Sequence, residues 1–482
     1  MGSYRTIRSY VLVAAVSLAT AAGCTQKNLS LGDQWIARDR SDLNHTPASL
    51  GVPVQSLRQA NRSHPIILAT SRPTTQPAAF DRNSDGVFFG VAVSGGGSRS
   101  ANFAAPCMFE LEQLGLLQRV DYISSVSGGS LTAAYYCVAT PDEWRADIVQ
   151  RKLTHSFADD ALIPMFMPWN WIPLTFSDWD RSDLLADSFQ KHVFSRKGKA
   201  LTFGDLRPDR PRLLINATDL QSGKPFVFSN ESFELINSDL SKYPIAYAVT
   251  ASAAVPVLLH HVTLRDYSTT FKQYVHLIDG GVTDNLGIRT LTDLYDAQRK
   301  ASKAAGQPEP YPRGAVFIVI DARTEFDAKL SDKSDIGLID SLATGAGLTS
   351  TVLINRASSA TLAEIILEHS PDDVTAGTLR KQKEELERRG HIQLKDNAGH
   401  PVYVVHFALS RLSDLKDLPF ASFHERVNNI ETYFNISQTE AYNLHQAAEL
   451  LVTERYIEPL REIGRWMDSP SPTTAASKSA QK

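Results

Sequence analysis

The 482-residue sequence lacks any concentration of charge of one sign. Its 49 Lys and Arg residues nearly balance its 53 Asp and Glu residues, which gives a formal net charge of -4. A nucleic-acid-binding protein would carry a concentrated basic face, so we expect no nucleic-acid partner. The stretch KQKEELERRG (381–390) mixes both signs and is most simply a solvent-exposed helix.

The N-terminal segment lacks a hydrophobic run of the roughly 20 residues that span a bilayer. A shorter apolar run follows Arg5 and Arg8 and ends in small residues before Cys24. This order is typical of a secretory signal, which we predict over residues 1–23. The ending AAGC resembles a bacterial lipoprotein box, with Cys24 lipid-modified, and Thr25 resembles the outer-membrane sorting pattern. We therefore expect a lipid-anchored protein of the bacterial cell envelope, on the periplasmic or surface face of the outer membrane. An ordinary cleaved signal with an incidental cysteine is the alternative.

Cysteine is scarce, with three residues in the chain. Cys107 shares one face of a predicted helix with Phe103 and Leu111, so a buried, unreactive thiol is expected. A disulfide with Cys137 stays open, because the sequence does not give the geometry. No ligand cluster with metal spacing is visible, so we expect neither a metal nor another cofactor.

Strand-like apolar runs alternate with helical patterns along the middle of the chain. Strands are predicted at 86–94, 120–126, 211–220, 225–230 and 315–322, and helices at 101–117 and 129–139. This alternation favours an α/β protein with a mostly parallel central sheet covered on both faces.

The predicted organisation has five parts. They are a signal peptide (1–23), an N-terminal tether and lead-in (24–85), an α/β domain (86–330), a mainly helical C-terminal extension or cap (331–466) and a disordered tail (467–482). Within the C-terminal part, 404–412 is strand-like and 425–454 is helical. These segments either complete the core or form a separate cap.

The segment ALIPMFMPWNWIPLTFSDW (161–179) combines three prolines with Met, Phe and three Trp residues. The prolines exclude a long helix. A core-packing insertion is one interpretation. A lid or a membrane-interface patch is the other, because Trp favours that boundary.

Residues 121–137, DYISSVSGGSLTAAYYC, join a predicted strand to a predicted helix and contain four serines. In a nucleophile elbow, the positions two residues before and after the serine must be small, because strand and helix crowd there. Around Ser127 these positions are Ser125 and Gly129. Two of the other serines fall within the strand and one in the first helical turn, so Ser127 is the candidate nucleophile. Taken alone, the stretch is also compatible with an ordinary glycine–serine loop.

A second glycine-rich stretch, SGGGSRS (94–100), also lies between a predicted strand and a helix. Gly95, Gly96 and Gly97 let the backbone approach a ligand, and their N–H groups join the positive end of the helix. Such a loop binds a phosphate or the oxyanion of a tetrahedral intermediate. The stretch lacks the G-K-[ST] ending of a P-loop and the G-x-G-x-x-G spacing of a dinucleotide site. Beside a nucleophile elbow, an oxyanion hole is the better interpretation.

The stretch HLIDGGVTDNLGI (276–288) offers a base for the serine. Asp279 ends an apolar run and is followed by Gly280 and a second glycine, which allow close approach. Its carboxylate could accept the serine proton directly, and a positioned general base contributes about 10²–10⁴-fold to a rate. A tight turn is the structural alternative for DGG.

Three histidines keep a second base open. An α/β-hydrolase triad needs an acid and then a histidine after the serine. His260, His261 and His276 are available for that role. A histidine without a catalytic role, either hydrogen-bonded in the interior or exposed on the surface, is the default interpretation.

In this order, GGGSRS, SVSGG and DGG resemble the motifs of the patatin-like phospholipases, or lipid acyl hydrolases. Those motifs are a glycine-rich oxyanion loop, a serine elbow shortly after it and a D-G-[GA] turn well downstream. INATDLQSGKPFVFS, VTASAAVPVLL and the extension DGGVTDN through Asn285 also look like family segments. The resemblance covers residues 86–290, and more loosely the strand that ends at Asp321.

The resemblance implies a three-layer α/β/α fold and hydrolysis of ester bonds in membrane lipids, of phospholipase or lysophospholipase type. It implies a Ser–Asp dyad, with Ser127 as nucleophile and Asp279 as base. The residues implied in supporting roles are Gly95, Gly96 and Gly97 as oxyanion donors, Arg99 as the basic residue of the loop, and Gly129, Gly280 and Asn285.

The chain departs from the family pattern at Ser125, where an elbow usually begins with Gly, and at both ends of the oxyanion loop. Ser94 stands where the family has Asp, and Ser100 where it has Gly. A catalytically silent, membrane-anchored lipid-binding or scaffold protein is therefore the alternative function. A thioester or a lysophospholipid is the alternative substrate.

Overall fold

The central feature of the computed structural model is one mixed β-sheet. The structure describes residues 28, 80–162, 181–256, 259–270, 272–324, 374–415, 418–419, 422–430, 432 and 434–469. The predicted signal peptide, Cys24, nearly all of the tether, residues 163–179 of the Trp-rich segment and most of the tail lie outside these ranges. Those predictions are therefore not addressed by the fold.

Nine strands of the described residues form the sheet in the order β10-β11-β9-β1-β2-β5-β8-β7, with β6 paired to β5. Their bounds are β1 (Val87–Val93), β2 (Tyr122–Val126), β5 (Arg212–Asp219), β6 (Lys224–Phe228), β7 (Val262–Asp266), β8 (Gln273–Asp279), β9 (Gly314–Asp321), β10 (His391–Lys395) and β11 (Pro401–Ala408). β11, β9, β1, β2 and β5 are mutually parallel, whereas the pairs β10–β11, β5–β6, β5–β8 and β7–β8 are antiparallel. A separate two-stranded ribbon joins β3 (Ser195–Arg196) to β4 (Lys199–Ala200).

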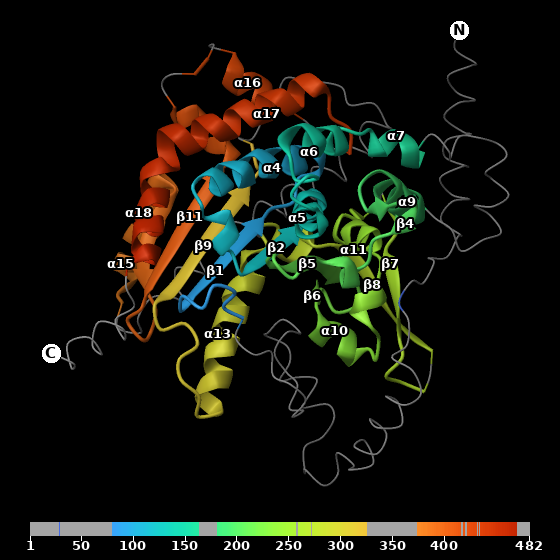
Figure 1. The fold of residues 1–482 in the computed structure, drawn as a ribbon, viewed down its shortest axis with the longest axis horizontal. Coiled ribbons are helices and arrows are strands. Elements are labelled where there is room, and N and C mark those ends of the chain that lie inside the picture. The colour runs from blue at the N-terminus through green and yellow to red at the C-terminus, as the bar shows by residue number, and fades with distance from the viewer. Residues whose placement is uncertain are drawn as a thin grey trace.

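Helices cover both faces of the sheet, which gives three layers. One face packs against α4 (Gly97–Gln113), α5 (Gly128–Val138), α11 (Ile245–Ser252) and α17 (Gln438–Leu451), and the other against α13 (Ile288–Ala304) and α15 (Ala376–Arg389). The remaining α-helices are α6 (Ala146–Leu153), α7 (Phe157–Leu162), α9 (Arg181–His192), α10 (Asn230–Leu235), α12 (Gly281–Asp284), α16 (Phe423–Asn428) and α18 (Ile457–Asp468). Short 3-10 turns occupy Leu117–Arg119, Phe203–Asp205, Leu240–Lys242 and Leu409–Asp414, and a π-turn occupies Val452–Tyr456. Figure 1 shows α4 and α5 crossing the central strands.

The α/β fold class predicted from the sequence is confirmed. The predicted strands match β1, β2, β5, β6 and β9 to within one or two residues. β1 and β9 are buried along their whole length, which explains their unbroken apolar sequences. KQKEELERRG lies in the solvent-facing part of α15, as expected.

Helix α4 begins at Gly97, four residues earlier than predicted. Glycine and serine are poor helix formers, so the sequence pattern placed the start too late. Cys107 and Cys137 are both buried and free, so they form no disulfide. Burial raises the pKa of the Cys107 thiol well above its usual value, and this thiol is unreactive as expected.

The described residues of the C-terminal segment contribute two strands to the central sheet and pack onto it rather than form a separate cap. β11 runs parallel to β9 from Val402 to Ala408, and β10 pairs antiparallel with β11. Helix α17 packs along α4 on the same face as α5. The sheet core is therefore assembled from both ends of the described chain.

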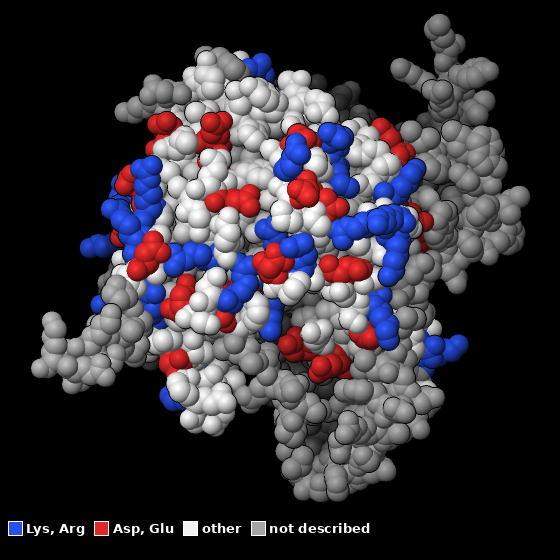
Figure 2. Space-filling model, in the orientation of Figure 1, with Lys and Arg blue, Asp and Glu red and all other residues white. Residues whose placement is uncertain are grey.

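The molecular surface carries charges of both signs. On the face seen in Figure 2, Lys and Arg side chains are interspersed with Asp and Glu side chains. Within the described ranges, no helix combines the length and apolar character that crossing a bilayer requires.

Candidate active site

Ser127 occupies a strained turn between β2 and α5. Its backbone has φ 50° and ψ −129°, a conformation that residues with a side chain rarely adopt. The two following glycines make the turn sterically feasible. A Cβ atom on Gly128 would collide with the backbone of Gly97, and one on Gly129 with the carbonyl oxygen of Ser94. The expected requirement for small residues at the elbow therefore has a direct structural cause.

The strained backbone of Ser127 is held by Ser252, the last residue of α11. The Ser127 N–H donates to Ser252 Oγ over 2.8 Å, and the same hydroxyl donates to the Asn216 carbonyl over 2.5 Å. Ser130 Oγ lies 3.1 Å from Ser252 Oγ. Sequence reasoning noted the surrounding segment VTASAAVPVLL but did not single out Ser252. Its contact with Ser127 joins residues 125 positions apart, which no local pattern indicates.

Asp279 ends β8 beside the elbow. The register places Val126 opposite Asn216 and Asp279 opposite Ala217, so β2, β5 and β8 bring serine and carboxylate together. Asp279 Oδ1 accepts from the Gly281 N–H over 2.7 Å, and the Ser127 hydroxyl donates to the carboxylate.

Burial sets the charge state of this carboxylate. It raises the pKa of Asp279 to about 6, against the opposing effect of the Gly281 N–H and the Ser127 hydroxyl. No cation of the described residues contributes to this pKa. Gly280 is required beside it, because a Cβ atom there would collide with the Asn216 carbonyl.

The three candidate histidines do not join this pair. Side chains alternate along a strand, so His276 points to the opposite face of β8 from Asp279. Its Nδ1 lies 3.1 Å from Thr263 Oγ1, and its ring packs edge-on against His261 at 4.5 Å. The His260 carbonyl accepts from Ser182 Oγ over 2.6 Å. Within the described ranges, neither Ser127 nor Asp279 has a hydrogen bond to a histidine in the structure.

The glycine loop packs directly against the elbow, but Gly95 does not supply a free donor. Its N–H donates to the Asn285 carbonyl over 2.9 Å. A Cβ atom at Gly95 would meet the Asn285 side-chain oxygen and come within 3.3 Å of Ser127 Cβ. In the structure the Gly95 N–H is therefore occupied, whereas the sequence predicts it as an oxyanion donor. Gly95 is a contact residue that lets Asn285 and Ser127 lie close together.

The N–H groups available to an anion belong to Gly96, Gly97 and Gly128. None of them donates to an acceptor among the described residues. They occupy the first positions of α4 and α5, where backbone donors have no intrahelical partner. Both helix N-termini carry partial positive charge and meet at Ser127. Sequence reasoning missed Gly128, although the residue after an elbow serine commonly supplies an oxyanion donor.

Ser94 and Ser100, the two departures in the loop, stabilise its shape. Ser100 Oγ donates to the Ser94 carbonyl over 2.5 Å, and Ser94 Oγ accepts from the Ala322 N–H over 3.0 Å. The loop is thereby fastened to the end of β9.

Arg99 anchors the first turn of α4. Its Nε donates to the Ala322 carbonyl over 2.9 Å and its Nη1 to the Ile430 carbonyl over 2.7 Å. Burial lowers the pKa of Arg99 to about 10, partly offset by Asp321, so the guanidinium is charged at neutral pH. Arg99 positions the loop against both the sheet and the C-terminal segment.

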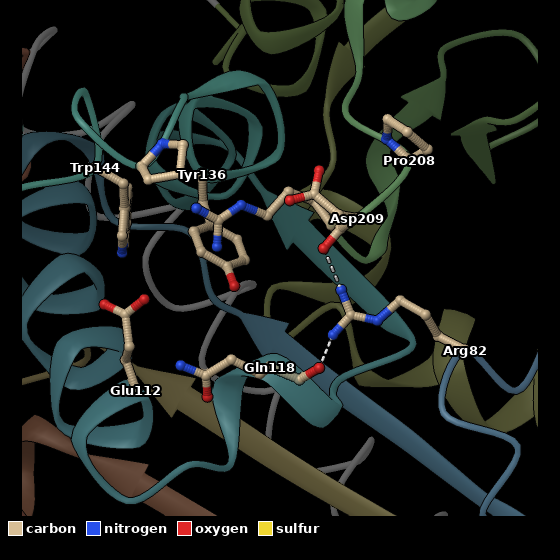
Figure 3. A pocket seen from close by; sticks show the side chains of 9 residues that line it. Arg82, Glu112, Gln118, Tyr136, Trp144, Pro208 and Asp209 are labelled. Atoms are coloured by element: carbon tan, nitrogen blue, oxygen red, sulfur yellow. Dashed lines mark hydrogen bonds between the residues drawn. The ribbon is translucent and has the colours of Figure 1, made fainter.

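The cavity drawn in Figure 3 lies away from Ser127. It has a volume of about 470 Å³ and is lined by residues that precede strands, including Arg82, Gln118 and Arg210. Ser127 follows β2 and the glycine loop follows β1. The serine therefore lies at the carboxyl ends of the parallel strands, and the cavity lies at their amino ends. Arg82 donates to the backbone carbonyls of Gln118 and Asp209, which occupies its guanidinium. We assign no part of the serine chemistry to this cavity.

Known proteins share one family model and a partial structural likeness with this chain. Residues 91–292 match the family model described as patatin-like phospholipase. No protein of curated function matches the chain. Human GIVD cytosolic phospholipase A2 is similar over 83% of this chain and 64% of its own, with 12% identity and a TM-score of 0.45. VipD from Legionella pneumophila is similar over 77% of this chain and 67% of its own, with 12% identity and a TM-score of 0.28.

The chain spans less than two thirds of the length of the human enzyme that it resembles. The family match, in contrast, begins within β1 and ends within α13, and so contains the glycine loop, the elbow and the Asp279 turn. Residues 91–292 therefore form a patatin-like phospholipase domain.

Proposed function

We propose that this chain is a serine acyl hydrolase that cleaves ester bonds of membrane lipids, with Ser127 as nucleophile and Asp279 as general base. The observation that carries the proposal is the hydrogen bond from the Ser127 hydroxyl to a buried carboxylate with a pKa of about 6. Such a carboxylate is ionised at neutral pH yet basic enough to take a proton during attack. The family match supports the lipid ester as the substrate class.

The reaction follows the two halves of nucleophilic catalysis. Ser127 Oγ bonds to the acyl carbon while its proton passes to Asp279. The carbonyl oxygen becomes an oxyanion, which the N–H groups of Gly96, Gly97 and Gly128 can receive. Collapse of the intermediate breaks the ester bond, and the leaving alcohol takes the proton from Asp279. Water then attacks the acyl-serine and gives a proton to Asp279. The bond between Ser127 Oγ and the acyl carbon breaks, the proton returns from Asp279 to Ser127 Oγ, and the fatty acid leaves.

The test measures ester hydrolysis and covalent labelling by a fluorophosphonate. We expect Ser127→Ala to abolish both, and Asp279→Asn to reduce hydrolysis by about 10²–10⁴-fold, the usual contribution of a general base. Exposed Ser222→Ala is the matched control and should behave as wild type. Full activity in Asp279→Asn together with its loss in His276→Ala would overturn the dyad.

The alternative of a silent lipid-binding scaffold rested on the unusual serines of the elbow and loop. Ser94 and Ser100 hold the loop in place, so these departures do not favour the scaffold. The labelling experiment separates the two functions, because a scaffold without an activated serine leaves Ser127 unlabelled.

We further propose that the chain is anchored to the bacterial envelope through a lipid on Cys24. The sequence order of charge, apolar run and AAGC supports this. In a bacterial host, Cys24→Ser should move the protein from the membrane to the soluble fraction and abolish incorporation of labelled palmitate. Unchanged fractionation and labelling in this variant would contradict the anchor.

A further inference from the structure

Three side chains with metal-binding atoms converge at the junction of α7 and α9. They are His155, immediately before α7, Asp160 within α7, and His192 at the end of α9. Their ligand atoms all lie within 4.8 Å of one another. Asp160 Oδ2 is 2.8 Å from His155 Nε2 and 3.1 Å from His192 Nε2.

Hydrogen bonding does not satisfy all of these atoms. Asp160 Oδ2 pairs with His155 and also accepts from Ser188 Oγ over 2.8 Å. His192 Nε2 is buried, but its approach to the same oxygen misses hydrogen-bond geometry. The two imidazole rings stack with centroids 3.7 Å apart, so both nitrogen edges face the carboxylate. His192 Nε2 therefore lies 3.1 Å from an oxygen that already has two hydrogen-bond partners.

The spacing suits a small tetrahedral cation. Zinc bonds of about 2.0–2.2 Å to nitrogen and oxygen place neighbouring ligand atoms of a tetrahedral site about 3.3–3.6 Å apart. The separations from Asp160, 2.8 and 3.1 Å, are shorter than this, and the three side chains are partly exposed and can move outward. Two imidazoles with one carboxylate favour zinc over calcium or magnesium, which prefer all-oxygen sites.

We propose that His155, Asp160 and His192 bind a Zn²⁺ ion, with the fourth position open to water. Ser188 would not contact the ion, but its hydrogen bond would orient the Asp160 carboxylate. The sequence did not predict this site, because His192 lies more than thirty positions from the other two ligands and no motif spacing links them.

The ion would stabilise the structure around α9. It would join α7 to α9, which lie side by side in Figure 1. Helix α9 also packs against α11, the helix that ends at Ser252. The zinc site is thus expected to raise the stability of this region without taking part in the serine chemistry.

The experiment uses the full chain without a histidine tag, freed of metal and titrated with Zn²⁺ by calorimetry. We expect one ion per chain, and a melting temperature that rises with zinc concentration because only the folded state forms the site. Co²⁺ substituted for zinc should give the visible absorption of a low-coordinate site. His192→Ala and Asp160→Asn should weaken Zn²⁺ binding at least 10-fold.

The matched control is His445→Ala, which removes an exposed histidine on α17 and should bind zinc as wild type does. Circular dichroism of each metal-free variant shows whether it is folded, and His155→Gln provides a milder change if alanine variants unfold. Ester hydrolysis should persist in metal-free protein below its melting temperature. Absence of one-to-one binding by wild type, or equal affinity in folded His192→Ala and His155→Gln variants, would overturn the proposal.

Discussion

Two buried aspartates at strand ends show how surroundings decide the role of a carboxylate. Asp279 and Asp321 are both fully buried, and burial raises the pKa of each. At Asp321, however, Arg323 and His406 outweigh burial and hold the pKa well below its usual range. Their nitrogens lie 2.7 and 2.9 Å from Asp321 Oδ2. Asp279 has only uncharged donors among the described residues, so it retains the basicity that a proton acceptor needs.

The raised pKa of Asp279 predicts a pH dependence of activity. Below pH 6 the Asp279 carboxyl is increasingly protonated and cannot accept the Ser127 proton. We expect kcat/KM to fall about tenfold per pH unit on the acid side of pH 6 and to level off above it. Stopped initial-rate measurements from pH 4.5 to 8 on a soluble ester test this. A rate that is flat across pH 6 would contradict Asp279 as the base.

The opposite pKa shifts of Asp279 and Asp321 predict opposite effects of their substitutions on stability. Because the pKa of Asp279 is raised on folding, its ionisation destabilises the native state as pH rises from about 3.8 to about 6. Asp279→Asn should therefore raise the free energy of unfolding at pH 8, by up to about 3 kcal/mol, with no gain near pH 3.8. Asp321→Asn should lower stability at pH 8, because the Arg323 ion pair and the His406 hydrogen bond stabilise the charged form. Denaturant unfolding at both pH values distinguishes these signs, and equal shifts for the two variants would refute the argument.

At the scale of an element, β2 contains two adjacent buried serines with different environments. Ser124 Oγ donates to the Gly287 carbonyl over 2.5 Å and accepts from Asn216 Nδ2 over 2.8 Å. Ser125 Oγ is equally buried but has no hydrogen-bond partner among the described residues. The two side chains point to opposite faces of the strand, so their surroundings are independent.

We expect Ser125→Ala to stabilise the protein by about 1 kcal/mol, because it removes a buried unsatisfied hydroxyl. Ser124→Ala should destabilise it by about 1–3 kcal/mol, since it removes the donor to the buried Gly287 carbonyl and one of the two acceptors of Asn216 Nδ2. Chemical denaturation of the two variants against wild type measures both effects. Destabilisation by Ser125→Ala of the same size as Ser124→Ala would show that Ser125 has a partner in solution.

The features that could be predicted from the sequence are determined by residues within one segment. The features that were missed depend on contacts between distant segments. β1 and β9 could be predicted because continuous burial imposes continuous apolar sequence. The sharp turn at Ser127 could be predicted because such a turn requires small neighbours at fixed positions. In contrast, the loss of Gly95 as a donor depends on Asn285, and the support of Ser127 depends on Ser252. These contacts form only when distant segments meet, so single-segment patterns do not contain them.

At the scale of the whole molecule, the family match ends before the sheet is complete. The match stops at residue 292, but β9 lies between β1 and β11 in the middle of the sheet. The C-terminal segment reaches the site as well, because the Ile430 carbonyl accepts from Arg99. The last helix is tied to the start of β9 by Arg313 Nη1, which donates to the Met467 carbonyl over 3.0 Å.

A chain that ends at residue 330 should therefore fail to fold into an active domain. It would lose β11, whose buried side chains include Val402, Val404, Val405 and Phe407. At about 1.5–3 kcal/mol each, burial of these four side chains is comparable to the total stability of an ordinary protein. The truncation would also expose β9 as a long apolar edge, which favours aggregation. A chain ending at residue 469 keeps every described element and is the matched control. Expression, circular dichroism and ester hydrolysis compare the two, and a soluble, active chain ending at residue 330 would show that the C-terminal strands are dispensable.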